Sequence, residues 1–270
     1  MKPIKLIYIV IVIILINLAP FKAFSQQADV DPAKTEVWKP VPEVVLTEGE
    51  ISVSPPSDAL VLFDGSGLDK WAASKNDYRY SESETLARMV MKDEDAEWVV
   101  ENGILTVVPG TGNIRTRQRF NDMQLHIEWR IPEDDGQGQN WGNSGVFIQG
   151  RYEVQILNSW SNENPTYSNG MAGSIYKQHI PLVNASRAPG EWQNYQITYY
   201  APRFTDEGKV NKPARITVLH NGVFIHDNVE IKGNTVHRGP PYYDHHGAAP
   251  IVIQDHGDKV SFRNIWVREL

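Results

Sequence analysis

The segment from Asn143 to Leu157, NSGVFIQGRYEVQIL, constrains the fold more than any other part of the chain. Apolar and polar residues alternate on both sides of its central Gln-Gly-Arg, which predicts two antiparallel strands that reverse at the glycine. One expected face comprises Val146, Ile148, Val154 and Ile156, and the other comprises Phe147, Gln149, Glu153 and Gln155. The second face would carry a carboxyl group, two amides and an aromatic ring, a combination typical of a sugar-binding surface.

Similar short segments recur along the chain and are separated by turn residues. Asn102-Gly103 and Asn221-Gly222 each stand between apolar runs, and this dipeptide favours a hairpin because both positions tolerate positive φ. Further strands are predicted at residues 59–63, 124–131, 192–200, 250–254 and 260–267. We find no long amphipathic helix after the first 25 residues and no fixed repeat. The pattern therefore predicts an all-β fold, an antiparallel sandwich or barrel, over residues 59–270.

The first 58 residues differ from the rest. Lys2 and Lys5 precede an apolar run over residues 6–18, and Ala23-Phe24-Ser25 offers a cleavage site, so residues 1–25 are predicted to be a signal peptide cut after Ser25. An uncleaved membrane anchor is the alternative, because the apolar run is long for a signal peptide. Residues 26–58 are rich in proline, which disfavours helix and interior strand, and we expect a linker or an arm laid along the domain.

Composition narrows the expected surroundings and partners. The chain has no cysteine, so it has no disulfide, no thiolate metal site, no cysteine nucleophile and no lipid-anchoring cysteine after the signal. Its formal net charge of −7 argues against nucleic acid or an anionic membrane surface as a partner. We therefore expect a periplasmic or secreted protein, without stable membrane association after signal cleavage, whose sheets are held together by a hydrophobic core.

Strand alternation also suggests an acid–base site. In the strand at 124–131, the apolar residues share one face, so His126, Glu128 and Arg130 share the other. If this strand and the hairpin at 143–157 belong to one curved sheet, Glu128 and Glu153 face the same groove. Two carboxyl groups facing one substrate are the minimum for splitting a glycosidic bond, one as acid and one as base or nucleophile. A surface salt bridge is the alternative for each glutamate.

Three further groups near the C-terminus are candidates. Asp255-His256 follows the strand at 250–254 and could position a general base or a cation, or could form an Asx turn with an exposed histidine. Arg263 could donate its guanidinium to a carboxylate or to sugar hydroxyls. Asp244, His245 and His246 are a weak ligand pattern, so neither a metal site nor a cofactor is predicted.

A series of ordered motifs includes LFDGSGLDKW, WVVENGILTVVPGTGNIRT, NSGVFIQGRYEVQIL, GSIYKQ and IVIQDHGDKVSFRNIWVREL. Over residues 60–270 this series resembles the bacterial family of 3-keto-disaccharide hydrolases. The resemblance implies a concanavalin A-like lectin/glucanase jelly roll with a concave substrate face, acting on glycosides whose C3 hydroxyl has been oxidised to a ketone. Residues 74–95, expected to be a polar surface insertion with one short helix, are longer than the family's usual link at this point.

The resemblance also implies site residues and a mechanism. By position, the family's motif residues correspond here to Asn143, Ser144, Glu153, Gln155, Tyr176, Lys177, Asp255, His256 and Arg263, and strand alternation adds Phe147. A ketone at C3 acidifies the C2 proton, so a base can remove it while an acid assists departure of the oxygen at C1, and water can later add to the enone. We expect Glu153 to be base or acid, His256 its partner, and Lys177 the group that stabilises the enolate. Hydrolysis by Glu128 and Glu153 is the alternative mechanism.

The competing function is a non-catalytic carbohydrate-binding, lectin-like module, since the same sandwich hosts both. Such a module would line its groove with aromatic rings, and Trp141, Trp160, Tyr167 and Tyr176 are close enough in sequence to do so. A structural or adhesive role ranks third. Carbohydrate is the expected partner for both the enzyme and the module.

Overall fold

The computed structural model describes residues 30–74 and 94–270. The predicted signal peptide and the short helix expected within residues 74–95 fall outside the described residues. Across the two described ranges, none of the helices is long and apolar enough to cross a membrane.

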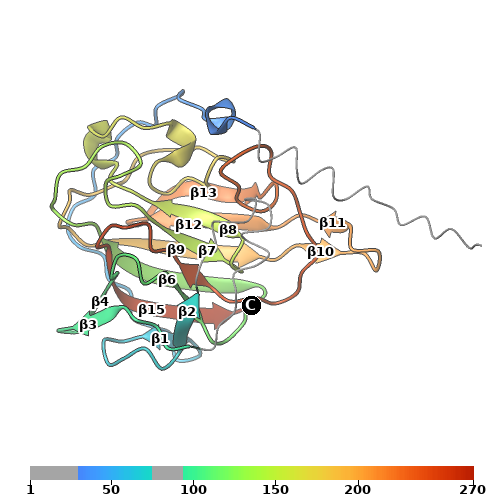
Figure 1. Cartoon of the computed structure of the whole chain (residues 1–270), viewed down its shortest axis with the longest axis horizontal. Coiled ribbons are helices and arrows are strands. Elements are labelled where there is room, and N and C mark those ends of the chain that lie inside the picture. The colour runs from blue at the N-terminus through green and yellow to red at the C-terminus, as the bar shows by residue number, and fades with distance from the viewer. Residues whose placement is uncertain (1–29, 75–93) are drawn as a thin grey trace, which may run out of the picture.

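Two antiparallel sheets make up the domain, and they overlap in the view of Figure 1. The larger has the order β13-β12-β9-β6-β15-β4-β3, with β1 also paired to β15. Its strands are β1 Leu60–Phe63, β3 Val99–Glu101, β4 Ile104–Thr106, β6 Met123–Arg130, β9 Gln193–Tyr200, β12 Arg215–His220, β13 Val223–Glu230 and β15 Ser261–Glu269. The smaller sheet, in the order β2-β5-β14-β7-β8, comprises β2 Trp71–Ser74, β5 Asn113–Thr116, β14 Val252–Ile253, β7 Ser144–Ile148 and β8 Tyr152–Ile156.

The remaining elements are small. Strands β10 Arg203–Phe204 and β11 Val210–Lys212 form a separate ribbon. The helical turns in the described ranges are all 3-10: η1 Pro32–Thr35, η2 Trp160–Asn162 and η3 Ser168–Gly170. The predicted all-β antiparallel sandwich is therefore confirmed.

Both predicted Asn-Gly hairpins are confirmed. Asn102 and Gly103 have φ values of 51° and 78° between β3 and β4, and Asn221 and Gly222 have 50° and 79° between β12 and β13. Strand β2 was not predicted, because its residues Trp-Ala-Ala-Ser are all buried and show no apolar–polar alternation.

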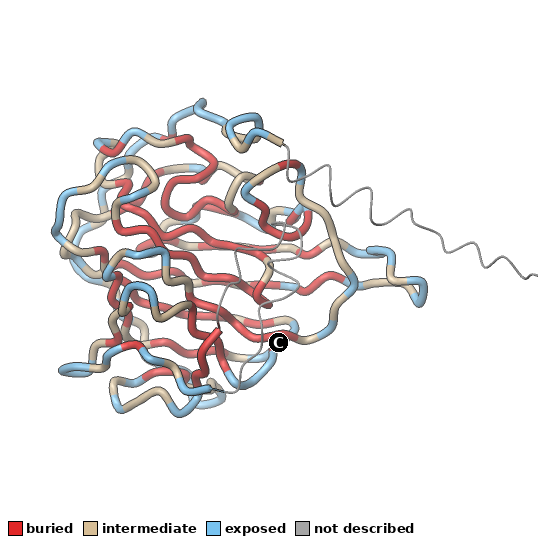
Figure 2. The backbone as a smooth tube through the Cα atoms, in the orientation of Figure 1, coloured by how far each residue is buried: buried red, intermediate tan, exposed pale blue. Residues whose placement is uncertain are grey.

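The core lies between the two sheets. It contains Leu125, Ile127 and Trp129 from β6, and Val146, Ile148, Val154 and Ile156 from the β7–β8 hairpin, as alternation predicted. Figure 2 shows that buried backbone is concentrated in these strands. The expectation that Glu128 and Glu153 share one groove is wrong, because β6 and β8 belong to different sheets. Each glutamate points away from the core of its own sheet, so the two lie on opposite outer faces of the sandwich.

Residues 30–58 form an arm that runs along one edge of the sandwich (blue in Figure 1). Its backbone joins the long β8–β9 loop, where Val45 N donates to Asn184 O at 2.8 Å. It then crosses the outer face of the larger sheet, where Trp266 Nε1 donates to Val53 O at 3.0 Å. Residues 30–58 of the proline-rich segment therefore lie along the domain.

Candidate functional site

Glu153 stands on the outer face of the smaller sheet, paired across β7 with Phe147. Its side chain is buried, at 4% exposure, and burial raises the pKa of its carboxyl group to about 8. The neighbouring Gly145 makes room for it: a Cβ there would lie 2.5 Å from Glu153 Oε1 and 3.0 Å from the Phe147 ring. The chain therefore holds this carboxyl group away from water, which keeps it largely protonated at neutral pH.

The side-chain amides of Gln155 and Gln139 lie between this carboxyl group and the β8–β9 loop. With its nitrogen turned toward Glu153, the Gln155 amide donates to Oε1 at 3.0 Å and to the Ser144 carbonyl at 2.8 Å. The other end of the same amide lies 3.1 Å from Gln139. Gln139 Nε2 in turn donates to Thr166 Oγ1 at 2.6 Å, so the β8–β9 loop is connected to Glu153 through two side-chain amides.

Two tyrosines lie beside Glu153. Tyr167 and Tyr176 share a hydroxyl–hydroxyl hydrogen bond of 2.6 Å, and the Tyr176 backbone N–H donates to Glu153 O at 3.2 Å. Burial raises the pKa of Tyr167 to about 12 and raises that of Tyr176 further, and the charge of Glu153 adds to both shifts. Both hydroxyls are therefore neutral at physiological pH and can donate hydrogen bonds.

Lys177 lies next to this tyrosine pair. Its Nζ is 5.4 Å from the centre of the Tyr167 ring and 5.9 Å from that of Tyr176. The ammonium donates to Pro32 O in the arm and to His237 O, each at 2.8 Å. Lys177 therefore binds the arm next to the tyrosine pair. The sequence predicted a different role for it, the direct stabilisation of an enolate.

The register of the smaller sheet adds residues that the sequence reasoning missed. The row that contains Glu153 continues through Phe147, Val252, Arg115 and Ala72. The neighbouring row contains Gln155, Gly145, Gln254, Asn113 and Ser74. Asn113 Nδ2 and Gln254 Oε1 are buried, and neither has a hydrogen-bond partner among the described residues. Alternation around the core residues Ile114 and Ile253 could have placed them on this face.

The profile of 3-keto-alpha-glucoside-1,2-lyase-like domains matches residues 58–268. The chain belongs to this family. A protein from Parabacteroides distasonis, provisionally named a glycosyl hydrolase, is 44% identical, with a TM-score of 0.73 over 88% of this chain and 96% of the other. A second protein of that organism, provisionally given the same name, is 17% identical with a TM-score of 0.53 over 78% and 94% of the two chains, which shows the fold alone. A search of curated proteins finds no match.

These findings show a carbohydrate-active protein built on a concanavalin A-like lectin/glucanase sandwich, as the resemblance implied. The 3-keto-alpha-glucoside-1,2-lyase-like domain begins at residue 58, so residues 30–57 of the arm precede it. Any contribution of the arm to the site is therefore additional to the matched domain.

The other predicted residues of this family member fall into different places. Asp255 accepts hydrogen bonds from the backbone N–H groups of Gly110 at 2.8 Å, Gly112 at 3.0 Å and Gly257 at 3.0 Å. This is the Asx-turn alternative, in which the carboxylate ties two loops together. His256 is exposed beside it, and no contact within the described part of the chain joins it to Glu153.

Asn143 and Ser144 lie at the start of β7, and their hydrogen bonds fix the backbone there. Asn143 donates from its backbone to Asp258 Oδ2 at 2.7 Å and from its amide to Gln139 O at 2.6 Å. Ser144 Oγ donates to Gln254 O at 2.8 Å. Both residues therefore shape the backbone around Gly145, where the Glu153 carboxyl group lies.

Glu128 is buried on the opposite face, where it pairs with the partly exposed Arg263. Arg263 Nε donates to Glu128 Oε2 at 2.7 Å, and Ser52 Oγ and Asn264 Nδ2 donate to Oε1 at 2.6 Å and 2.7 Å. Burial raises the pKa of Glu128, but hydrogen bonds from His126, Ser52 and Asn264 outweigh this and lower it below its ordinary value. Glu128 is thus a buried, ionised partner of Arg263 that also accepts a hydrogen bond from Ser52 of the arm, whereas the alternative hypothesis was a salt bridge at the surface.

Asp244 and His246, in the histidine-rich segment before β14, contact side chains of the domain. His246 Nε2 lies 2.7 Å from Tyr152 Oη, and Asp244 pairs with Arg151 at 3.3 Å. Across residues 30–74 and 94–270, no three histidine, aspartate or glutamate side chains are grouped so that they could hold a metal ion.

Proposed function

We propose that this protein is an exported enzyme that cleaves glycosides carrying a ketone at C3, and that Glu153 is its proton-transfer group. The observation that carries the proposal is a buried carboxyl group with a pKa of about 8 on the outer face of the smaller sheet. Perturbed carboxyl groups of this kind concentrate at catalytic sites. Membership of the 3-keto-alpha-glucoside-1,2-lyase-like family supports the substrate class.

A pKa of about 8 suits a group that both accepts and returns a proton near neutral pH. Ionised Glu153 takes the C2 proton, and the electron pair of the C2–H bond moves into an enolate whose oxygen is on C3. The enolate then expels the oxygen at C1, which takes the proton back from Glu153, and water adds to the resulting enone. The rival two-carboxylate route receives no support, because Glu128 lies on the other face.

Neutral donors around Glu153 fit the charge that develops in this reaction. The hydroxyl pair of Tyr167 and Tyr176 uses one of its two hydrogens in the bond between them, so the other can be donated to an enolate oxygen or to a sugar hydroxyl. Phe147, in the same row as Glu153, offers an apolar surface to the face of a sugar ring.

The test is cleavage of a 3-keto-disaccharide, followed by chromatography of the released monosaccharides, with the unoxidised disaccharide as the matched control. Glu153→Gln should lower turnover by about 100-fold or more, while Glu128→Gln should leave it within a few-fold. Binding without release would instead identify a lectin-like module. A change of only a few-fold for Glu153→Gln would remove Glu153 from the mechanism.

Reaction in D2O separates elimination from direct hydrolysis. Elimination followed by hydration places a solvent deuteron at C2 of the 3-keto product, whereas direct hydrolysis leaves C2 unlabelled. The 3-keto product incubated without enzyme provides the correction for spontaneous exchange.

Export rests on the signal-peptide pattern of residues 1–25. Amino-terminal sequencing of protein recovered from the periplasm or culture medium should begin at Gln26. Recovery of the uncleaved chain from the membrane fraction would support the anchor alternative.

A further inference from the structure

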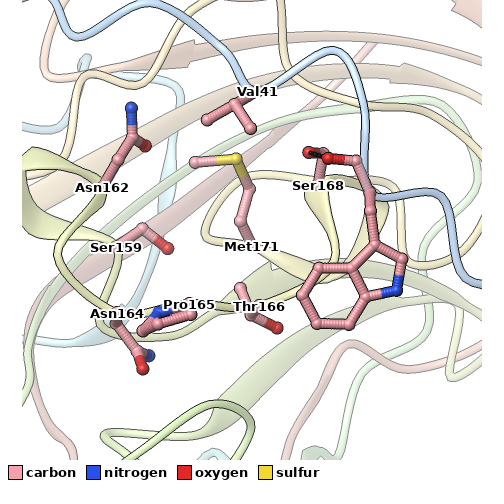
Figure 3. Close-up of a pocket in the computed structure, with 9 residues that line it drawn as sticks. Val41, Ser159, Asn162, Asn164, Pro165, Thr166, Ser168 and Met171 are labelled. Carbon is pink, nitrogen blue, oxygen red and sulfur yellow. Dashed lines mark hydrogen bonds between the residues drawn. The ribbon is translucent and has the colours of Figure 1, made fainter.

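A hollow of about 230 Å³ lies between the arm and the β8–β9 loop. Its wall includes Trp38 and Val41 from the arm and Ser159, Asn162, Thr166 and Met171 from the loop (Figure 3). We infer that this hollow is a carbohydrate subsite that binds the sugar ring on the leaving-group side of the scissile bond. The inference rests on the proposed function for the identity of that bond. The arm residues precede the matched family domain, so the family does not assign this wall.

Trp38 is held in place yet remains 52% exposed. Its carbonyl accepts a hydrogen bond from Ser168 Oγ at 3.0 Å, and the preceding Val37 N–H donates to Asn169 Oδ1 at 2.9 Å. The indole meets the Tyr167 ring edge-on, with centroids 6.1 Å apart and an angle of 73°. An ordered aromatic ring with half of its surface free is a suitable platform for the apolar face of a sugar.

The polar groups of the hollow are arranged as hydrogen-bond donors. Ser159 Oγ accepts from Ala172 N at 2.9 Å, and Thr166 Oγ1 accepts from the Gln139 amide at 2.6 Å. Each hydroxyl retains its own hydrogen, for which the described residues provide no acceptor. Met171 supplies an apolar surface beside them. Hydroxyl donors next to apolar and aromatic surface match a sugar ring, which has both hydroxyls and C–H faces.

The size of the hollow limits its occupant. Pockets for drug-sized ligands measure roughly 300–1,000 Å³, so a hollow of about 230 Å³ suits one ring rather than an oligosaccharide.

The hollow and the Glu153 site share residues. Gln139 donates to Thr166 Oγ1, on the wall of the hollow, and its Oε1 lies 3.1 Å from the side-chain amide of Gln155, which in turn contacts the Glu153 carboxyl group. Tyr167 likewise contacts Trp38 on one side and Tyr176 on the other. The two sites are therefore neighbours, and the inferred arrangement has the 3-keto ring beside Glu153 and the second ring against Trp38.

The experiment compares kcat/KM on a 3-keto-disaccharide and on the one-ring methyl 3-keto-glucoside. Trp38→Ala should lower kcat/KM for the disaccharide about tenfold, mainly through KM, and leave the methyl glycoside within twofold. Trp38→Phe should restore most of the loss. Leu46→Ala, at an exposed arm residue outside the hollow, is the matched control and should change neither. Equal losses on both substrates, or none on the disaccharide, would overturn the subsite.

Direct binding keeps this test separate from the proposed function. Saturation-transfer NMR with the unoxidised disaccharide measures contact without any cleavage. Loss of the saturation signal in Trp38→Ala, but not in Leu46→Ala, would support the subsite even if the wild-type protein cleaved nothing, in which case only the proposed function fails. An unchanged signal in Trp38→Ala would overturn the subsite even if cleavage were observed.

Discussion

Replacing Glu153 by glutamine should make the protein more stable at high pH. Burial moves the pKa of this carboxyl group from 4.5 to about 8, so the folded state keeps a proton that the unfolded state loses. Below about pH 4.5 the group is neutral in both states and has no effect on the free energy of unfolding. Between about pH 4.5 and 8 it lowers that free energy by ~1.4 kcal/mol per pH unit, for a total on the order of 5 kcal/mol.

This contribution is large compared with the free energy of unfolding of most domains, which is ~5–15 kcal/mol. Glutamine has nearly the same shape, and its neutral amide does not ionise. The free energy of unfolding of the variant should therefore exceed that of the wild type by little at pH 5. This excess should be several kcal/mol larger at pH 8. Urea unfolding of both proteins at pH 5, 6.5 and 8 measures it directly.

Glu128→Gln is the matched control, because the pKa of Glu128 is lowered and its stabilising effect is lost only as pH falls below about 4.5. Its stability difference from wild type should be constant between pH 5 and 8. If Glu153→Gln showed the same constant difference, Glu153 would be ionised in the folded protein. The argument for a proton-transfer carboxyl group would then be refuted.

Three further substitutions test the site. Gly145→Ala places a methyl group 2.5 Å from Glu153 Oε1 and should displace the carboxyl group. We expect kcat to decrease at least tenfold while the circular dichroism spectrum stays native. Unchanged turnover would show that the position of the carboxyl group is unimportant. Glu128→Gln should lower the unfolding free energy by about 2 kcal/mol, because a charge-assisted hydrogen bond to Arg263 is lost while Arg263 keeps its ion pair with Glu50; a cost below about 0.5 kcal/mol would contradict its anchoring role. Asp255→Ala should lower stability by ~1–2 kcal/mol in urea unfolding with little effect on KM; a large KM increase would return Asp255 to the binding residues.

Local patterns in the sequence were sufficient for most of the fold. The two Asn-Gly turns and the alternating apolar residues of the β7–β8 hairpin identify strands because turn geometry and a period of two depend only on neighbouring residues. The same alternation correctly turned Glu153 and Gln155 away from the core. It failed for β2, whose residues are all buried and show no alternation.

The sequence alone determined that this chain is an antiparallel sandwich of a carbohydrate-active family with Glu153 on an outer face. Only the tertiary structure decided which strands share a sheet, and it separated Glu128 and Arg263 from Glu153. It also brought Trp38 and Lys177, which are far apart in sequence, to the same tyrosine pair. The reason is physical: alternation specifies the side of a strand on which a residue lies, whereas sheet order depends on packing between segments distant in sequence.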